Sequence, residues 1–271
     1  MTTDATALPG TAIPGRAGEL LAALGDRAEC CGLYDANGSS IYHELSQQDH
    51  HEVRELIALV RRHPGPVLDL AAGSGRLTMP LLALGREVSA LELSESMLDL
   101  LRERLDAAPA ALRERCTLVR GDMSDFALRR EFDCVVLATT SVSLLDEAGR
   151  KGLYASVRAH LAPGGRFLLT TVDLEASQQP EFELEFSTAA GNDYRMFEYW
   201  EPGMEARTVT VFPAHHGPGP VRVGLTSIRV LPADRLAAEL SANGFRVTAR
   251  HALPPVGVRH HSTLLEAEAA A

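Results

Sequence analysis

The chain has 271 residues, of which 45% are hydrophobic, and its formal net charge is -10. This length suffices for one globular domain with a full core, with or without a small annex. No block of Lys and Arg residues could track a phosphate backbone, so we expect no nucleic-acid partner. The apolar runs are too short to cross a bilayer and the N-terminus does not resemble a signal peptide, so we expect no membrane partner and a cytoplasmic location.

Residues 1–16 are rich in Thr, Ala, Pro and Gly without periodicity and predict a flexible arm. From residue 17 to residue 173, short apolar runs alternate with amphipathic stretches, a pattern typical of β-α units on a parallel sheet. The predicted strands are residues 67–70, 87–91, 117–120, 132–138 and 166–172. The predicted helices run through residue 84 and over residues 97–105 and 146–161.

The pattern changes after Asp173, where apolar and polar residues alternate between turns of Gly, Asn and Pro. The segments that alternate in this way are residues 182–186, 194–200, 207–212 and 221–230. We expect an antiparallel β lid over residues 174–230, inserted after the fifth strand. A helix over residues 233–242 and strands over residues 245–252 and 263–266 then complete a core made of residues 17–173 and 231–267.

A strand, a tight turn and a helix follow one another over residues 67–78. Gly73 and Gly75 let the backbone approach a ligand closely at the carboxyl end of the first strand, where open α/β sheets bind ligands. A dinucleotide site would need a third glycine where Thr78 stands, so that a helix N-terminus could meet a pyrophosphate. The turn therefore favours a ligand without phosphate.

Three carboxylates near strand ends indicate what this ligand carries. Glu92 ends the second strand, and an ionised acid there can accept both hydroxyls of a ribose but would repel the 2'-phosphate of NADP. Asp122, just past the third strand, can accept an amine hydrogen bond from a purine, with Met123 and Leu93 in apolar contact with the ring. Asp69 can attract an ammonium group. The sequence therefore predicts a site for a nucleoside that carries an amino acid.

Together, these motifs resemble the class I S-adenosylmethionine (SAM)-dependent methyltransferases over about residues 30–266. The matching pieces are Asp69-x-Ala71-x-Gly73-x-Gly75 with Thr78, Glu92-Leu93-Ser94 followed by Met97, Gly121-Asp122-Met123, Phe132-Asp133, and Leu161-x-Pro163-Gly164-Gly165. The resemblance implies an α/β fold with a Rossmann-like seven-stranded sheet, a reversed last hairpin and SAM as cofactor. It implies a cofactor site made of Asp69, Ala71, Gly73, Gly75, Glu92, Leu93, Met97, Asp122, Met123 and Thr139.

Within this family the chain looks like small-molecule N-methyltransferases with an antiparallel lid, among them the sugar N,N-dimethyltransferases. Residues 121–133 are especially similar to those enzymes. Those enzymes often carry a His a few residues after the fourth strand, where this chain has Leu144, so no role passes from that His to this chain. A weaker similarity is to the methyltransferases of daptide-type ribosomal peptide clusters.

Methyl transfer from a sulfonium requires that the acceptor lone pair be aligned with the C–S bond and that water be excluded, but no covalent nucleophile. The expected catalytic residues are Thr139 and Ser141 after the fourth strand, beside Thr140, together with Tyr34 and Tyr42. Tyr34 and Tyr42 belong, with Asp49, His50 and His51, to the segment that closes over SAM in related enzymes. We expect the acceptor to contact Tyr194, Tyr199 and Trp200, as an aromatic wall of the lid, and His215.

We expect no metal site, although the chain contains histidines in three adjacent pairs, at positions 50–51, 215–216 and 260–261. Neighbours in a strand point apart and neighbours in a helix do not converge, and the four cysteines match no metal-ligand spacing. His215 or His251 remains a candidate general base.

The leading hypothesis is N-methylation, up to a dimethylated product, of an amine on a specialised metabolite or ribosomal peptide. The alternatives are a small-molecule O-methyltransferase with a basic residue near the acceptor hydroxyl, a non-catalytic SAM-binding partner protein, and a dinucleotide oxidoreductase. The expected partner of a methyltransferase is a small-molecule or peptide acceptor, and the sequence leaves a homodimer open.

Overall fold

A computed structural model of the chain describes residues 12–46, 52–175, 179–254 and 260–270. The chain forms two compact units, a smaller one made of residues 1–49 and 176–230 and a larger one made of residues 50–175 and 231–271. Asp49, His50 and His51 lie outside the described residues.

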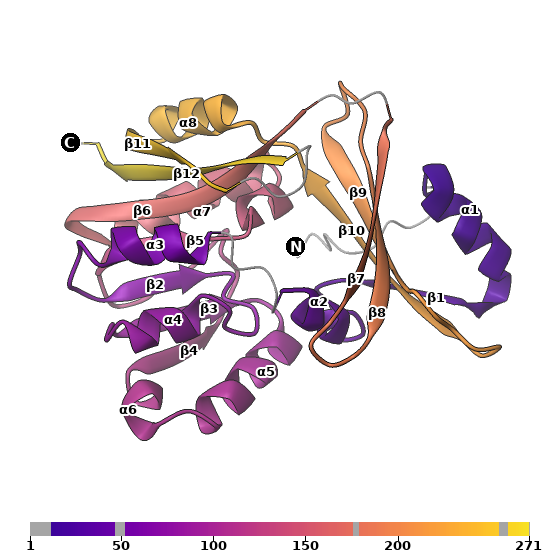
Figure 1. Cartoon of the computed structure of the whole chain (residues 1–271). Helices are drawn as coiled ribbons and strands as arrows, with labels where there is room; N and C mark the ends of the chain where they lie inside the picture. Colours follow the sequence, from indigo (N-terminus) through magenta and orange to yellow (C-terminus); the bar gives the residue numbers. More distant parts are fainter. Residues whose placement is uncertain (1–11, 47–51, 176–178, 255–259, 271) are drawn as a thin grey trace. The chain divides into compact units, whose positions relative to one another are not determined.

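The larger unit contains a seven-stranded sheet in the order β11-β12-β6-β5-β2-β3-β4 (Figure 1). Its strands are β2 (Val67–Leu70), β3 (Val88–Glu92), β4 (Cys116–Arg120), β5 (Phe132–Leu137), β6 (Leu161–Leu174), β11 (Phe245–Ala252) and β12 (His260–Ala269). Strands β2 to β6 pair in parallel, whereas β12 runs antiparallel to both β6 and β11. The predicted seven-stranded sheet with a reversed last hairpin is therefore confirmed.

Helices cover both faces of this sheet. On one face, buried residues of α7 (Glu147–His160) and α8 (Ala233–Ala242) pack on the sheet. On the other face, α3 (Val53–Val60), α4 (Thr78–Ala83) and α5 (Glu95–Asp106) do so, and α6 (Ala110–Arg113) follows α5 in the chain. The four residues of β2 are all buried, as a central strand covered on both faces requires.

One segment that the sequence predicts as a turn lies inside a strand in the structure. Strand β6 begins at Leu161, ahead of the Pro163-Gly164-Gly165 segment that predicts a turn. The register against β5 shifts there, because Phe132 pairs with Leu161 but Cys134 pairs with Arg166. Gly164 has a φ of 78°, so the segment forms an irregularity inside the paired strand.

The smaller unit contains a five-stranded sheet in the order β1-β10-β9-β8-β7. Its strands are β1 (Ala28–Gly32), β7 (Glu181–Ser187), β8 (Asp193–Tyr199), β9 (Ala206–Pro213) and β10 (Val221–Arg229). Strands β7 to β10 are antiparallel neighbours and follow β6 in the chain, whereas β1 pairs in parallel with β10. Helix α1 (Gly15–Leu24) packs on one face and α2 (Ser39–Ser46) on the other, and the short 3-10 helix η1 (Gly25–Arg27) follows α1.

The start of the chain differs from its predicted place. The sequence predicts a flexible arm to residue 16 and a core from residue 17, but α1 already begins at Gly15 and lies in the smaller unit. The reason is the pairing of β1 with β10, which draws residues 28–32 into the second sheet.

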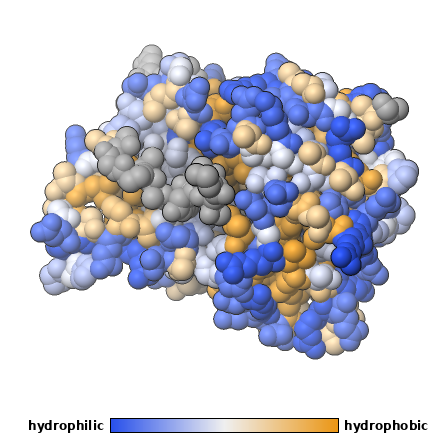
Figure 2. Space-filling view, turned by 180° about the vertical axis from the view of Figure 1, so that it is seen from behind, coloured by the Kyte–Doolittle hydropathy of each residue, from blue (hydrophilic) through white to orange (hydrophobic). Residues whose placement is uncertain are grey.

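None of the helices in the described part of the chain combines the length and the apolar character needed to span a membrane. Hydrophilic residues cover much of the molecular face in Figure 2, as the acidic composition leads one to expect.

Candidate functional site

The glycine turn after β2 adopts the backbone that its sequence predicts. Gly73 and Gly75 have φ values of 55° and 87°, and Ala71 shares this left-handed region at 51°. A Cβ on Gly73 would meet nothing within 4 Å, whereas one on Gly75 would lie 2.4 Å from Leu101 Cδ1 of α5. Gly73 thus leaves open space beside the turn for a ligand, and Gly75 allows α5 to pack closely.

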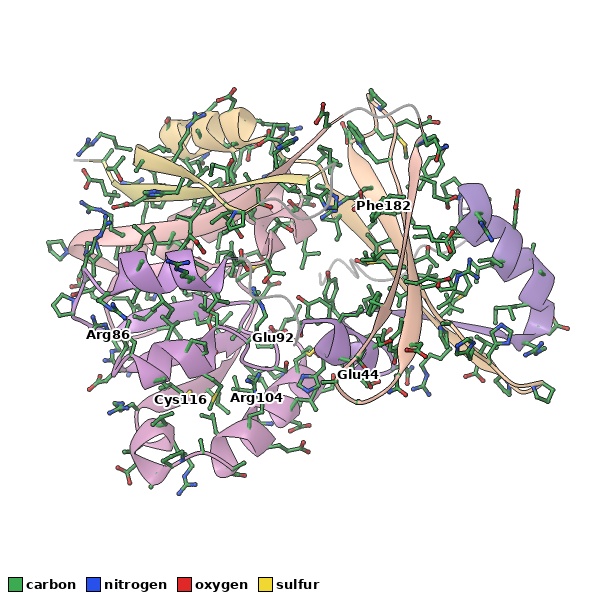
Figure 3. All side chains as sticks on the ribbon, viewed as in Figure 1. Glu44, Arg86, Glu92, Arg104, Cys116 and Phe182 are labelled. Carbon is green, nitrogen blue, oxygen red and sulfur yellow. The ribbon has the colours of Figure 1, made fainter. Side chains whose placement is uncertain are left out.

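Glu92 turns inward at the end of β3 rather than toward solvent. Its Oε2 accepts a hydrogen bond of 2.9 Å from Gly73 N, and its Oε1 accepts one of 2.9 Å from Ser94 N. Figure 3 shows Glu92 at the end of the sheet toward which β2 points. Burial raises the pKa of Glu92, and the hydrogen bonds from Ser94, Gly73 and Leu93 oppose that rise. Each carboxylate oxygen keeps a lone pair for a further donor, which suits a pair of vicinal hydroxyls.

Asp69 lies deeper than a ligand-binding carboxylate. The residue is 2% exposed, and its Oδ2 accepts a hydrogen bond of 2.6 Å from Thr78 Oγ1. Burial raises its pKa to about 7, against the opposing effects of the Thr78 hydrogen bond and the Arg76 charge. Asp69 therefore ties the strand to the first turn of α4, and its charge varies near neutral pH.

The residues predicted around the base occupy the ends of β3 and β4. Asp122 Oδ1 accepts a hydrogen bond of 2.8 Å from Ser124 N, and Gly121 N donates to Glu92 O at 3.0 Å, which brings the two strand ends together. Leu93 is 53% exposed, the largest exposure among the large hydrophobic residues described. Met97, in contrast, is 2% exposed and belongs to the core face of α5. An exposed apolar side chain beside a carboxylate can receive a heterocycle.

The end of β5 carries two consecutive threonines in a strained conformation. Thr139 and Thr140 have φ values of 57° and 53°, which cost about 1–2 kcal/mol each for an L-residue. Thr140 N donates to Thr170 Oγ1 at 3.1 Å, and Ser141 is 9% exposed at the start of the 3-10 helix η2 (Ser141–Leu144). Strain of this kind is typical of functional sites.

Three charged residues at this edge of the sheet were missed by the sequence analysis. Glu52, which is fully buried, forms an ion pair with Arg76 and accepts a hydrogen bond of 2.8 Å from Thr139 N. Arg104 of α5 donates to Ser74 O inside the glycine turn at 2.9 Å, and burial lowers its pKa. Only Arg76 carried a sequence signal, because it directly follows Gly75.

Tyr34 and Tyr42 lie together in the smaller unit. Their ring centroids are 4.9 Å apart with an interplanar angle of 68°, an edge-to-face contact. Between them, Asp35 accepts hydrogen bonds from Gly32 N at 2.8 Å and from Gly38 N at 2.9 Å. The turn that connects β1 with α2 is thus held by one carboxylate.

The predicted aromatic wall is not formed as expected. Tyr194 and Tyr199 are five residues apart on β8, whose pairing is regular, so their side chains point to opposite faces. Tyr194 is hydrogen-bonded to Glu44 of α2, and burial raises its pKa to about 12. Trp200 Nε1 donates to Met204 O at 3.0 Å, and Tyr199 OH donates to Glu201 Oε1 at 2.9 Å.

The candidate basic residues lie in different units. His215 has an 87% exposed side chain, with its Nε2 atom 3.8 Å from Asp193 Oδ2. His251 lies on the edge strand β11 with its Nε2 atom 3.5 Å from Glu266 Oε2. No group of three or more His, Cys, Asp or Glu residues in the described ranges is arranged to hold a metal ion.

The sequence profile of a family described as "Methyltransferase domain" matches residues 67–165. The chain is 38% identical over 118 residues to a dTDP-3-amino-3,4,6-trideoxy-alpha-D-glucopyranose N,N-dimethyltransferase from Streptomyces venezuelae, covering 42% of this chain and 46% of that protein. It is 32% identical over 147 residues to a cypemycin N-terminal methyltransferase from Streptomyces sp, covering 54% of this chain and 52% of that protein. The chain thus spans about half the length of these curated relatives.

A solved structure covers nearly the whole chain. The glycopeptide N-methyltransferase MtfA in complex with SAM is 40% identical, with a TM-score of 0.68, and the match covers 96% of this chain and 100% of that one. The same enzyme has been solved with sinefungin and with S-adenosylhomocysteine (SAH).

Proposed function

The chain belongs to the family of SAM-dependent methyltransferases, and we propose that it transfers a methyl group from SAM to an amine nitrogen of a small molecule or peptide. The proposal that this chain binds SAM rests on the carboxylate of Glu92, which accepts hydrogen bonds from Gly73 N and Ser94 N at the end of β3. The acceptor part is supported by the relatives, which are named for methyl transfer to an amino sugar, a peptide N-terminus and a glycopeptide.

The residues present fit the cofactor. The open space at Gly73 would receive the amino-acid part, Glu92 would accept the ribose hydroxyls, and Asp122 with Leu93 would hold adenine. When bound, SAM supplies a methyl group already activated by its sulfonium charge.

For an amine acceptor, the task of the chain is alignment and desolvation. An apolar cover lowers the pKa of the acceptor amine, so that a nitrogen lone pair is available for attack and the proton leaves to water or to a nearby oxygen. Thr139 and Ser141 remain the proposed residues that hold the acceptor, and Tyr34 and Tyr42 remain the proposed residues near the carboxylate or the methyl group of SAM.

We also keep residues 174–230 as the proposed lid over the acceptor. Since the side chains of Tyr194 and Tyr199 lie on opposite faces of β8, an acceptor on one face of the sheet cannot contact both of them. Tyr194 lies on the face that carries α2, the helix of Tyr42, whereas Tyr199 lies on the opposite face. We keep His215 and Trp200 as proposed acceptor contacts at the edge of the site. The His215 side chain is exposed, and Trp200 Nε1 already donates a hydrogen bond to Met204 O.

The test is an assay of the purified chain with SAM and a panel of acceptors: an amino sugar, a peptide with a free N-terminus and matched hydroxyl compounds. We expect products heavier by one or two methyl groups on nitrogen, identified by fragmentation in mass spectrometry. Products methylated on oxygen alone would contradict the proposal.

The cytoplasmic location and the homodimer stay predictions. Cell fractionation tests the location, and light scattering of the purified chain tests the homodimer.

A further inference from the structure

Among the described residues, every non-glycine residue with a left-handed backbone lies at the carboxyl ends of two neighbouring strands. Ala71 follows β2, and Thr139 and Thr140 follow β5. The two strands pair in parallel, with Leu70 opposite Leu137, so these residues are neighbours in space as well. β-branched residues resist this conformation strongly, and they keep it only where their surroundings impose it.

The group that imposes it on Thr139 is the carboxylate of Glu52. Its Oε1 accepts hydrogen bonds from Thr139 N at 2.8 Å and from Thr139 Oγ1 at 3.2 Å. The same oxygen forms the ion pair with Arg76, which directly follows Gly75 of the glycine turn. One oxygen atom therefore connects the ends of β5 and β2.

Glu52 is itself anchored in the core. It directly precedes α3, and Leu56 N donates to Glu52 O at 3.0 Å in the first turn of that helix. Leu56 and Val60 of α3 are fully buried. The carboxylate thus extends from a rigid base, which suits a residue that fixes the position of others.

The energetics of Glu52 argue against a role in stability alone. The residue is fully buried, and its Oε2 has no hydrogen-bond partner among the described residues. A buried carboxylate with one unsatisfied oxygen costs free energy, and an apolar replacement at such a position is often neutral or stabilising.

We propose that Glu52 is a positioning residue for the cofactor, which holds the end of β5 and the glycine turn after β2 in the conformation that receives the amino-acid part of SAM. The inference rests on the proposed function. Glu52 acts through Thr139 and Arg76, so its effect falls on SAM and on SAH alike, because both carry the same amino and carboxyl groups.

The test compares Glu52→Gln and Glu52→Asp with the wild type by calorimetric titration of SAM and SAH. The amide of Glu52→Gln still accepts a hydrogen bond from Thr139 N but has no charge for Arg76. We expect the Kd values of both ligands to rise about tenfold or more. Glu52→Asp keeps the charge on a shorter side chain, and we expect it to recover part of the affinity.

A matched control separates positioning from stability. Glu239→Gln removes the charge from another carboxylate that pairs with a buried arginine of the larger unit, Arg150, at 2.7 Å. We expect it to lower the Tm without changing either Kd. If Glu52→Gln lowers the Tm but binds SAM and SAH as the wild type does, the inference is wrong.

A milder variant keeps the test decisive if Glu52→Gln does not fold. Thr139→Ala removes two side-chain hydrogen bonds, the one of 3.2 Å to Glu52 and the one that Thr139 Oγ1 accepts from Arg76, and leaves the one from the backbone. We expect its Kd values for SAM and SAH to rise about threefold to fivefold, and wild-type values would overturn the inference. A wild-type chain that binds neither ligand would instead refute the proposed function.

Discussion

At the scale of single residues, Glu92 makes the most direct prediction about cofactor binding. A glutamine there has one carbonyl oxygen for the two N–H groups of Gly73 and Ser94, and its NH2 group would face one of them. We expect Glu92→Gln to raise the Kd of SAH about tenfold to a hundredfold, measured by calorimetry. The control is Glu95→Gln on the surface of α5, where the carboxylate side chain is 43% exposed. Equal Kd values for both variants would contradict the role of Glu92.

Asp69 makes a prediction about pH. Its pKa in the folded chain, about 7, lies above the unfolded value of 3.8, so the folded state binds more protons between these values and loses stability as the pH rises through them. Above pH 7 the buried charge costs up to ~4 kcal/mol. Asp69→Asn can still accept the Thr78 hydrogen bond without that charge. We expect its Tm to exceed that of the wild type at pH 8 by more than at pH 5, and a constant difference would refute this assignment.

The sequence predicts those site residues whose roles depend on their position beside a predicted strand. Glu92 and Asp122 could be predicted because each ends or follows a buried strand, and the carboxyl ends of parallel strands meet at one edge. Glu52 could not be predicted, because its partners Arg76 and Thr139 lie 24 and 87 residues further along the chain. Its sequence context, an acid before an amphipathic helix, is typical of many surface positions.

At the scale of elements, two glycines form a matched pair that isolates one packing contact. Gly75 and Gly85 have φ values of 87° and 88°, but a Cβ on Gly75 would meet Leu101 at 2.4 Å and a Cβ on Gly85 would meet nothing within 4 Å. Alanine at either site costs about 1–2 kcal/mol through the backbone. We expect Gly75→Ala to lose about 1–3 kcal/mol more in urea unfolding because the core is overpacked.

A second substitution tests the cause. Leu101→Ala in the Gly75→Ala background removes the close contact, so the two changes together should cost less than the sum of the single changes. If Gly75→Ala and Gly85→Ala are equally stable, the turn and α5 do not pack as tightly as the structure indicates.

The strands of the larger unit could be predicted because each is a short apolar run bounded by turn residues, as β2 and β5 are. Strand β1 was missed because the segment Ala28–Gly32 is short, contains a charged residue and a glycine, and lacks the β-branched and aromatic residues that are typical of strands. Its place depends on β10, whose residue Val221 pairs with Ala28. The periodicity and composition of a segment do not reveal a strand partner so far along the chain. The flexible arm predicted for residues 1–16 overlaps α1 for the same reason.

At the scale of the whole molecule, the division into two units predicts which residues a bound ligand protects from amide hydrogen exchange. The cofactor residues Gly73, Glu92 and Asp122 lie in the larger unit. We expect SAH to slow amide hydrogen exchange at residues 71–75, 92–94 and 138–141, measured by mass spectrometry. Strand β9, in the interior of the other sheet, serves as the internal reference and should exchange at an unchanged rate. Uniform slowing across both units would contradict this assignment.

The parallel pairing of β1 with β10 has a consequence for biosynthesis. Gly32 leaves the ribosome roughly 190 residues before Leu225, the residue that it faces in the sheet, and translation at about 5–20 residues per second makes this a delay of roughly 10–40 s. The seven-stranded sheet has by then received its first five strands, while the nascent N-terminal strand still lacks its neighbour. An unpaired strand edge invites foreign pairing, so chaperone dependence during synthesis should be concentrated in these first residues.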